Sequence, residues 1–158
     1  MSETLRTRIR HLLAAHATMT LATSGPEGPW ASAVFYASDA AFHLYFVTDP
    51  RTRHGANLLR EGRAAAAIHA DISDWYAIRG LQLEGRAHEL SDAERATGLE
   101  VYLNRFPEVR RLADSPHDEA ERRISERLAR IALWRLAPTR IRVLDNREGF
   151  GWKDELAL

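Results

Sequence analysis

The segment Thr48–His54 holds the side chains best suited to binding a phosphate: two threonine hydroxyls, two guanidinium groups and an imidazole. Pro50 is expected to end the preceding strand, and Thr52 is a suitable N-cap for a short helix. The free N–H groups of such a helix favour an anion, and arginine adds bidentate hydrogen bonds. Arg51 and Arg53 can instead pair with surface carboxylates. The residues alone therefore leave two interpretations open, a phosphate cradle and a set of surface ion pairs.

Other catalytic and metal-binding signatures are missing from the sequence. It has no G-x-x-x-x-G-K-[ST], G-x-S-x-G or H-E-x-x-H motif. The absence of cysteine excludes disulfides, thiolate chemistry and thiolate zinc or iron–sulfur sites. His11 and His16 would lie about 140° apart around a helix, so they do not form a metal clip. Ser32, Asp39 and His54 are scattered and no local pattern joins them into a triad. We predict no metal site and assign no catalytic residue.

The composition is balanced in charge but biased in its cations. The chain has 158 residues, which suits one domain with a substantial core. Its 22 basic residues offset 22 acidic ones, and a net charge of +0 argues against a nucleic-acid partner. Lys153 is the only lysine, so every other basic residue is an arginine. Almost every cation can therefore hold an oxyanion through two parallel hydrogen bonds.

Nothing in the sequence predicts a membrane segment. No apolar run approaches the ~18 residues of a membrane span, and residues 1–6 lack the apolar stretch of a signal peptide. We expect a soluble cytoplasmic protein with no membrane partner.

Hydrophobic spacing in the first half predicts a helix followed by three consecutive antiparallel strands. Apolar residues recur with helical spacing over 5–16. Segments that alternate with a period of two follow over 19–23, 30–37 and 42–48, with turns between them. A short helix is expected after Pro50.

The second half predicts further strands and a helical insertion. Many short strands with peripheral helices are typical of a small antiparallel barrel. In order, the expected elements are a strand over 63–70, a long strand over 76–90 with bulges at Gly80 and Gly85, a helix from a capping box at 91–94 to Arg105, a solvated helix from an N-cap at Ser115 to Arg130 with i,i+4 ion pairs, strands over 131–136 and 140–144, and a loop over 145–153.

A series of short motifs runs through nearly the whole chain in a characteristic order. They are Leu21-Ala22-Thr23, Gly28-Pro29-Trp30, Ala33-Val34-Phe35-Tyr36, Leu44-Tyr45-Phe46-Val47-Thr48, Thr52-Arg53-His54, Ile78-Arg79-Gly80, Tyr102-Leu103-Asn104-Arg105-Phe106-Pro107 and Asp145-Asn146 with Gly149-Phe150-Gly151. In this order the chain resembles the FMN-binding split barrels of the pyridoxamine-phosphate-oxidase-like superfamily, and an uncharacterised bacterial branch of it.

The resemblance implies a mainly β fold, a six-stranded antiparallel split barrel with peripheral helices. It also implies a homodimer with two FMN sites between the protomers. The single domain 1–158 would comprise an N-terminal helix (1–16), the main strands (17–90), a helical insertion (91–130), and the last strands with a C-terminal loop (131–158).

The resemblance also implies which residues contact the cofactor. Arg53 and His54 would bind the FMN phosphate, which carries about −1.5 to −2 charges at pH 7. His54 stands where the oxidases carry lysine, so its contribution is expected to fade as pH rises through about 6.5. The remaining implied contacts are Ala33, Val34, Phe35 and Tyr36 along the isoalloxazine, Val47, Thr48 and Thr52 near the ribityl chain and phosphate, Gln82 on the long strand, and Asn146, Trp152 and Lys153 in the C-terminal segment.

Departures from the oxidase pattern narrow the expected function. Ser32 and Ala37 align with an arginine and a substrate-binding lysine of the oxidases, and Gly80 aligns with a flavin-contacting glutamine. These differences argue against pyridoxamine-phosphate oxidation itself. We expect an FMN-dependent oxidoreductase acting on a small-molecule substrate, in which the protein supplies placement and electrostatics. The alternatives are a deazaflavin in the same groove and a non-catalytic cofactor-binding or haem-binding barrel.

Overall fold

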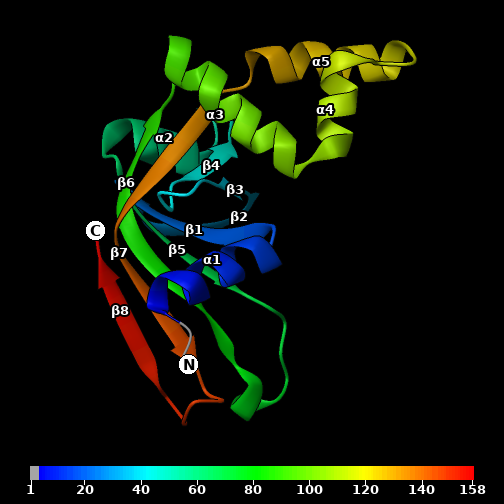
Figure 1. The fold of residues 1–158 in the computed structure, drawn as a ribbon. Helices are drawn as coiled ribbons and strands as arrows, with labels where there is room; N and C mark the ends of the chain where they lie inside the picture. The colour runs from blue at the N-terminus through cyan, green and yellow to red at the C-terminus, as the bar shows by residue number, and fades with distance from the viewer. Residues whose placement is uncertain (1–3) are drawn as a thin grey trace.

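The strands form one sheet that curves into a half-open barrel, with helices at its ends and side (Figure 1). The computed structural model describes residues 4–158. The predicted N-terminal helix is α1, Leu5–Ala15, and positions 1–3 of the segment 1–16 lie outside the described residues. The strands are β1 (Thr18–Gly25), β2 (Gly28–Phe35), β3 (Ala37–Ser38), β4 (Leu44–Val47), β5 (Arg63–His69), β6 (Arg79–Glu89), β7 (Leu133–Asp145) and β8 (Lys153–Ala157).

The long strand β7 organises the sheet. The strand order is β2-β1-β5-β6-β7-β4-β3, and β8 also pairs with β7. Every pairing is antiparallel. One edge of β7 pairs with β6, while its other edge pairs first with β4 and then with β8. The prediction that the first three strands pair in succession is therefore wrong for the third, because β4 pairs with β3 and β7 and not with β2.

Two strands were predicted where the structure has the single strand β7. The sequence Ala137-Pro138-Thr139 predicts a break, since proline cannot donate to a ladder. In the structure the β6–β7 ladder shifts register between Glu84 and Gly85: Glu84 pairs with Arg140 and Gly85 with Pro138, so Thr139 of β7 is the extra residue. A Cβ on Gly85 would lie 2.1 Å from the carbonyl oxygen of Ala137, so glycine allows the close approach. The predicted irregularity at Gly85 is confirmed, although its extra residue lies on β7, and it accommodates the proline within a continuous strand. The ladder is regular at Gly80, so the bulge predicted there is wrong.

The barrel interior is the main core, and alternation along the strands creates it. On β1, Met19 and Leu21 point inward while their neighbours are exposed. Trp134 of β7 is fully buried and its ring stacks against that of Phe46 on β4. A second cluster, which includes Tyr45, lies beneath α3.

The helices flank the barrel and carry most of the differences from the predicted elements. They are α1, α2 (Arg53–Arg60), α3 (Asp92–Arg105), α4 (Pro107–Asp114) and α5 (Glu119–Arg130), with a 3-10 turn η1 at Trp75–Ala77. Helix α2 with its cap at Thr52, and α3 ending at Arg105, confirm the prediction. Helix α4 was missed, and α5 is capped by Asp118 rather than Ser115. Ser91 caps α3 without a side-chain hydrogen bond.

The predicted split-barrel fold is confirmed, with eight strands in place of six. The short strands β3 and β8 account for the difference, and β8 replaces part of the predicted C-terminal loop. No described helix is both long and apolar enough to cross a membrane.

Candidate cofactor-binding site

The loop between β4 and α2 is held in a fixed shape by its own hydrogen bonds. The Thr52 hydroxyl donates to the carbonyl oxygen of Asp49 at 2.6 Å and accepts from the N–H of Gly55 at 3.1 Å. Gly55 packs so closely that a Cβ would lie 2.4 Å from the Asp49 carbonyl oxygen. The first N–H groups of α2 lack intrahelical partners by geometry. The loop therefore presents a preorganised helix N-terminus suited to an anion.

His54 joins three elements at this point. Its Nε2 makes a short hydrogen bond with the Thr48 hydroxyl at the end of β4, and its Nδ1 is 3.1 Å from the hydroxyl of Ser32 on β2. Burial lowers the pKa of His54 below its ordinary value. The imidazole is therefore mainly neutral at pH 7, and the expected loss of its positive charge occurs at lower pH than the sequence suggested.

Arg53 is held over the start of β2. Its Nη2 donates to the carbonyl oxygen of Glu27 at 3.1 Å, and its guanidinium lies 4.3 Å from the centre of the Trp30 ring. Its Nε is 3.6 Å from the Glu27 carboxylate. Arg53 is thus stabilised by a cation–π contact and a backbone carbonyl, beside the exposed end of α2.

Arg51 follows the ion-pair interpretation. Its guanidinium holds the Asp49 carboxylate through Nε at 3.0 Å and Nη2 at 2.6 Å. These bonds lower the pKa of Asp49 to about 2. Both arginines of the segment lie near a carboxylate, but Arg51 binds Asp49 closely at 2.6 Å whereas Arg53 is 3.6 Å from the exposed carboxylate of Glu27.

Strand β2 presents alternate side chains to two sides. Ala33 pairs with Thr20 on the outer face of the sheet, where Phe35 is 58% exposed. Ser32 and Val34 point the other way, opposite Leu21 and Met19 of the core. Tyr36 is buried and its hydroxyl donates to the carbonyl oxygen of Leu13 at 2.8 Å, while burial raises its pKa. Tyr36 is therefore a core residue, and its backbone N–H also has a partner in the carbonyl oxygen of Ala17 at 2.9 Å.

Two other implied contacts lie on strands away from the helix. Val47 is half-buried at the end of β4, next to Thr48. Gln82 lies on the outer face of β6, in a row with Ala67 of β5 and Thr20 of β1. Two strands separate it from β2, so the structure does not bring Gln82 to the Thr48–His54 loop.

The implied C-terminal contacts lie at the opposite end of the sheet from α2 (Figure 1). Asn146 is buried, where its side chain donates to the carbonyl oxygen of Trp75 at 2.6 Å and accepts from the N–H of Gly151 at 2.9 Å. Trp152 is half-buried beneath the guanidinium of Arg8. Lys153 is exposed at the start of β8. In this chain these residues do not come together with the Thr48–His54 loop.

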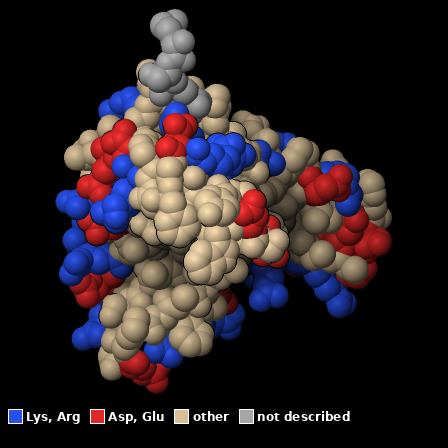
Figure 2. All heavy atoms as spheres, turned by 90° about the horizontal axis from the view of Figure 1, so that it is seen from below, with Lys and Arg blue, Asp and Glu red and all other residues tan. Residues whose placement is uncertain are grey.

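Three aromatic rings form a cluster at the same end of the molecule. Trp75 and Phe150 are 70% and 68% exposed and stack with ring centres 6.4 Å apart. Tyr76 meets the edge of Phe150 at 6.3 Å. The view from below shows uncharged side chains gathered in the middle of this face with charged ones around them (Figure 2). Phe150 is thus an exposed ring of the β7–β8 turn.

Sequence reasoning missed Ser32 as a partner of His54. As a pair, Ser32 and His54 entered the sequence analysis only as members of a triad with Asp39. The carboxylate of Asp39 instead binds His43 and Tyr45. The Gly25–Gly28 turn pairs Ser32 with Leu21. Because Leu21 is an interior residue by alternation, this register was a usable signal that Ser32 points toward the same side.

Five polar side chains lie together at the N-terminus of α2, and we call this group the cradle. They are those of Ser32, Thr48, Thr52, Arg53 and His54. The polar groups of the cradle are three hydroxyls, a guanidinium, an imidazole and the first backbone N–H groups of α2. Among them, the Thr52 hydroxyl donates to Asp49 and the Gly55 N–H donates to Thr52. The nearest carboxylate within the loop, Asp49, is neutralised by Arg51. This donor set fits the phosphate of a nucleotide-like cofactor.

A barrel of this topology, with helices at its ends and side, places the chain in the class of split-barrel proteins. The family model described as "Pyridoxamine 5'-phosphate oxidase" matches residues 5–145, and the chain belongs to that family. A UPF0306 protein of Klebsiella pneumoniae (strain 342) is 29% identical over 152 residues, which cover 96% of this chain and 91% of that protein.

Solved structures of the same fold bind different cofactors. A heme binding protein from Mycobacterium smegmatis has a TM-score of 0.77 and 25% identity, and the match covers 99% of this chain but 59% of that one. A FAD-binding protein from Mesorhizobium loti has a TM-score of 0.63 and 16% identity, covering 85% of this chain and 89% of that one. The fold is therefore shared by flavin-binding and haem-binding proteins.

Proposed function

We propose that this protein binds FMN through the cradle and acts as a flavin-dependent oxidoreductase. The observation that carries the proposal is the convergence of Thr48, Thr52, Arg53 and His54 at the N-terminus of α2. A dianionic phosphate placed there would accept hydrogen bonds from the Arg53 guanidinium and from backbone N–H groups of α2. The Thr52 hydroxyl already donates to Asp49, and a neutral His54 accepts from only one of its two hydroxyl partners, so one of Ser32 and Thr48 keeps a hydrogen for the phosphate. Because the His54 imidazole is mainly neutral, Arg53 supplies the positive charge.

The chain's own residues place and shield the cofactor. Bound FMN would supply hydride or electron transfer between a reduced donor and a small substrate. Strand β2 offers its backbone along one side of the isoalloxazine, and Val47 excludes water near the ribityl chain. Trp30 holds Arg53 by a contact of 4.3 Å, so the phosphate-binding guanidinium is already positioned before the cofactor arrives.

The substrate differs from that of the pyridoxamine-phosphate oxidases in this proposal. Ser32, at the position of an oxidase arginine, is engaged by His54 at 3.1 Å. Ala37, at the position of the substrate-binding lysine, is buried and carries no charge. Neither residue offers a phosphate-binding cation, which supports a substrate other than pyridoxamine phosphate.

A homodimer with the cofactor at the interface is part of the same proposal. The outer face of β1, β2 and β5 carries small side chains in register, with Ala33 opposite Thr20 and Thr20 opposite Ala67. Phe35 projects from this face. A flat face of small side chains beside an exposed ring supports close packing of a second copy. A cytoplasmic location remains a prediction from the sequence.

Haem binding without catalysis is a second candidate, supported by the fold shared with the Mycobacterium smegmatis protein. A haem iron needs a free imidazole nitrogen. Both nitrogens of His54 are engaged by hydroxyls, so His54 would have to break one of these bonds to serve as the axial ligand.

The visible spectrum of the purified protein distinguishes these candidates. Flavin, deazaflavin and haem have different absorbance, and FMN fluorescence is expected to fall as apoprotein is added. Titration of the apoprotein with haem, followed by the Soret band in wild-type and His54→Ala proteins, tests the second candidate. An apoprotein that neither quenches FMN fluorescence nor perturbs its absorbance would refute the FMN proposal.

A further inference from the structure

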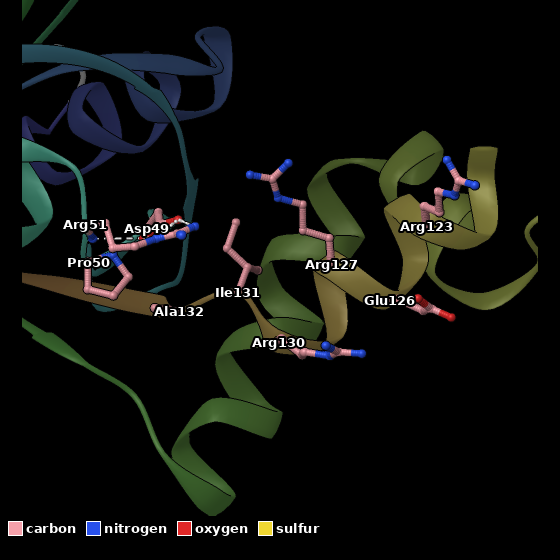
Figure 3. A pocket seen from close by; sticks show the side chains of 9 residues that line it. All are labelled: Asp49, Pro50, Arg51, Arg123, Glu126, Arg127, Arg130, Ile131 and Ala132. Atoms are coloured by element: carbon pink, nitrogen blue, oxygen red, sulfur yellow. Dashed lines mark hydrogen bonds and ion pairs between the residues drawn. The ribbon is translucent and has the colours of Figure 1, made fainter. Parts of the chain in front are cut away.

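A second ligand-sized cavity lies on the far side of the cradle loop. It has a volume of about 430 Å³ and lies between the β4–α2 loop and α5 (Figure 3). The backbone N–H of Thr48 donates to the carbonyl oxygen of Ala132, a residue of the cavity wall, at 3.1 Å. The cavity therefore adjoins the cradle but is built from different side chains. Its volume is within the range of small-molecule sites, which is about 300–1,000 Å³.

The wall of the cavity is rich in arginine. Arg123, Arg127 and Arg130 line it from α5, where positions separated by three and four residues share one helix face. Arg127 is directed toward the β4–α2 loop, whereas the guanidinium groups of Arg123 and Arg130 point away from that loop (Figure 3). Arg51 lines the opposite side and already binds the Asp49 carboxylate. In that ion pair the positive charge of Arg51 offsets the negative charge of Asp49, which weakens the repulsion between Asp49 and an anion.

Two of these arginines lack a carboxylate partner, unlike their neighbours on the same helix. Arg122 and Arg123 lie 3.9 Å and 3.7 Å from the carboxylate of Glu119. Within residues 4–158, Arg127 and Arg130 form no ion pair of this kind. The charge of Arg127 extends across the cavity, since it contributes to the lowered pKa of Asp49.

The remaining residues of the cavity wall indicate what the part of the ligand without the anionic group should be like. Pro50, Ile131 and Ala132 provide an apolar surface, and the Ile131 side chain lies between Arg51 and α5 (Figure 3). Glu126 also lines the cavity, and its carboxylate points away from Arg127 in the same view. Apolar wall and unpaired guanidinium groups together match a molecule with an apolar body and an anionic group.

We propose that this cavity binds a small organic anion whose phosphate or carboxylate pairs with Arg127, whose apolar body lies against Pro50 and Ile131, and whose affinity is raised by the positive charge of Arg130 in the cavity wall. This site is separate from the FMN cradle and does not depend on the proposed flavin chemistry. A ligand here would contact the loop that carries Thr52, so its binding would be sensed at the cap of α2.

Calorimetry with phenyl phosphate as the probe tests the proposal on the full-length apoprotein. The double variant Arg127→Ala/Arg130→Ala is expected to bind phenyl phosphate about tenfold more weakly or worse, because a charge-assisted interaction is lost. Arg122→Ala, on the same helix but outside the cavity, is the matched control and should bind normally. Glu126→Gln removes a competing carboxylate and should strengthen binding. Benzyl alcohol, which lacks the anion, should not bind.

Three outcomes would overturn the proposal, and a measurement of thermal stability controls for the fold. Unchanged affinity in the double variant, with loss in Arg53→Ala, would place the probe in the FMN cradle instead. No heat with any anion would exclude the site. Inorganic phosphate that binds as tightly as phenyl phosphate would refute the apolar half of the site. Equal thermal midpoints of the double variant and the wild-type protein verify that the fold is intact, and FMN titration in the same variants reports on the cradle separately.

Discussion

The cradle and the arginine-lined cavity lie on two sides of one loop, and they differ in whether their positively charged side chains have partners. In the cradle every polar side chain has a partner: His54 bonds to Ser32 and Thr48, and Arg53 to the Glu27 backbone. In the cavity, Arg127 and Arg130 have no carboxylate partner among the described residues. Preorganisation lowers the entropic cost of binding, whereas unpaired charge favours binding by any suitable anion.

The hydrogen bonds of the cradle therefore contribute to the stability of the folded chain, whereas Arg127 and Arg130 in the cavity make no ion pair that does so in the described part of the chain. A substitution in the cradle removes bonds that the folded chain uses even without ligand. A substitution at Arg127 or Arg130 removes only an unpaired charge. Stability measurements should therefore separate the two regions, and ligand binding should be affected in both.

The largest effect is expected from Gly55→Val. Its Cβ would meet the Asp49 carbonyl oxygen at 2.4 Å and the Pro50 Cα at 2.8 Å, both backbone atoms. We expect a loss of roughly 1–3 kcal/mol in the free energy of unfolding, measured by urea denaturation, together with loss of FMN binding. Ala56→Val, at the next and exposed position of α2, is the control and should cost much less. Equal losses in the two variants would show that the loop tolerates the added volume.

Arg53→Ala is expected to weaken FMN binding by about 1.5–3 kcal/mol, the range for a hydrogen bond to a charged group. Fluorescence titration measures the change. Arg60→Ala, in the last turn of the same helix, keeps the arginine count equal and should bind FMN normally. An unchanged dissociation constant in Arg53→Ala would refute the phosphate assignment.

Thr52→Ala removes the hydroxyl that accepts from Gly55 and donates to Asp49. Loss of such a cap typically costs about 1 kcal/mol of stability. Thr52→Ser retains the hydroxyl and should recover most of the difference in denaturant midpoint. If Ser and Ala variants are equally unstable, the effect comes from the methyl group and not from the cap.

Acid should weaken the cradle through His54. Its folded-state pKa is lower than the unfolded value, so the unfolded chain binds a proton first as pH falls. Stability is therefore fully present above about pH 6.5 and declines as pH falls through the folded pKa. Denaturation series at several pH values should show a shallower acid decline in His54→Gln than in the wild-type protein. His117→Gln, at an exposed position, serves as the control.

The smallest effect on stability is expected from Arg130→Ala in the cavity. With no carboxylate partner within residues 4–158, its removal should change the free energy of unfolding by no more than about 0.5 kcal/mol. A loss as large as that of Thr52→Ala would mean that the cavity, like the cradle, contributes to the fold.

Local patterns predicted the elements that depend on neighbouring residues. Pro50 and Thr52 set the start of α2, and alternation correctly separated the inward Met19 and Leu21 from their neighbours. The contacts between elements required distances that the sequence does not encode locally. Ser32 meets His54 only because β2 folds back beside α2, 22 positions away.

The ion pairs of the helical insertion also include contacts between elements that the local sequence does not predict. The stretch up to Arg130 was predicted to pair its charges at i,i+4, and Arg123 with Glu119 does so. Glu121, however, binds Arg111 of α4 at 2.9 Å, a helix that the sequence did not predict. A long-range partner can therefore take a carboxylate that the helical spacing assigns to a neighbour on the same helix.

The position of β7 has a consequence for how the chain folds as it is synthesised. Strands β4 and β6 each have one edge that pairs only with β7, and the first residue of β7 follows the whole helical insertion in the sequence. Until that strand leaves the ribosome, the emerging chain carries unpaired strand edges, and such edges invite association with other chains. Closure of the barrel is therefore a late step, and a chain stopped before residue 133 would be expected to require chaperones.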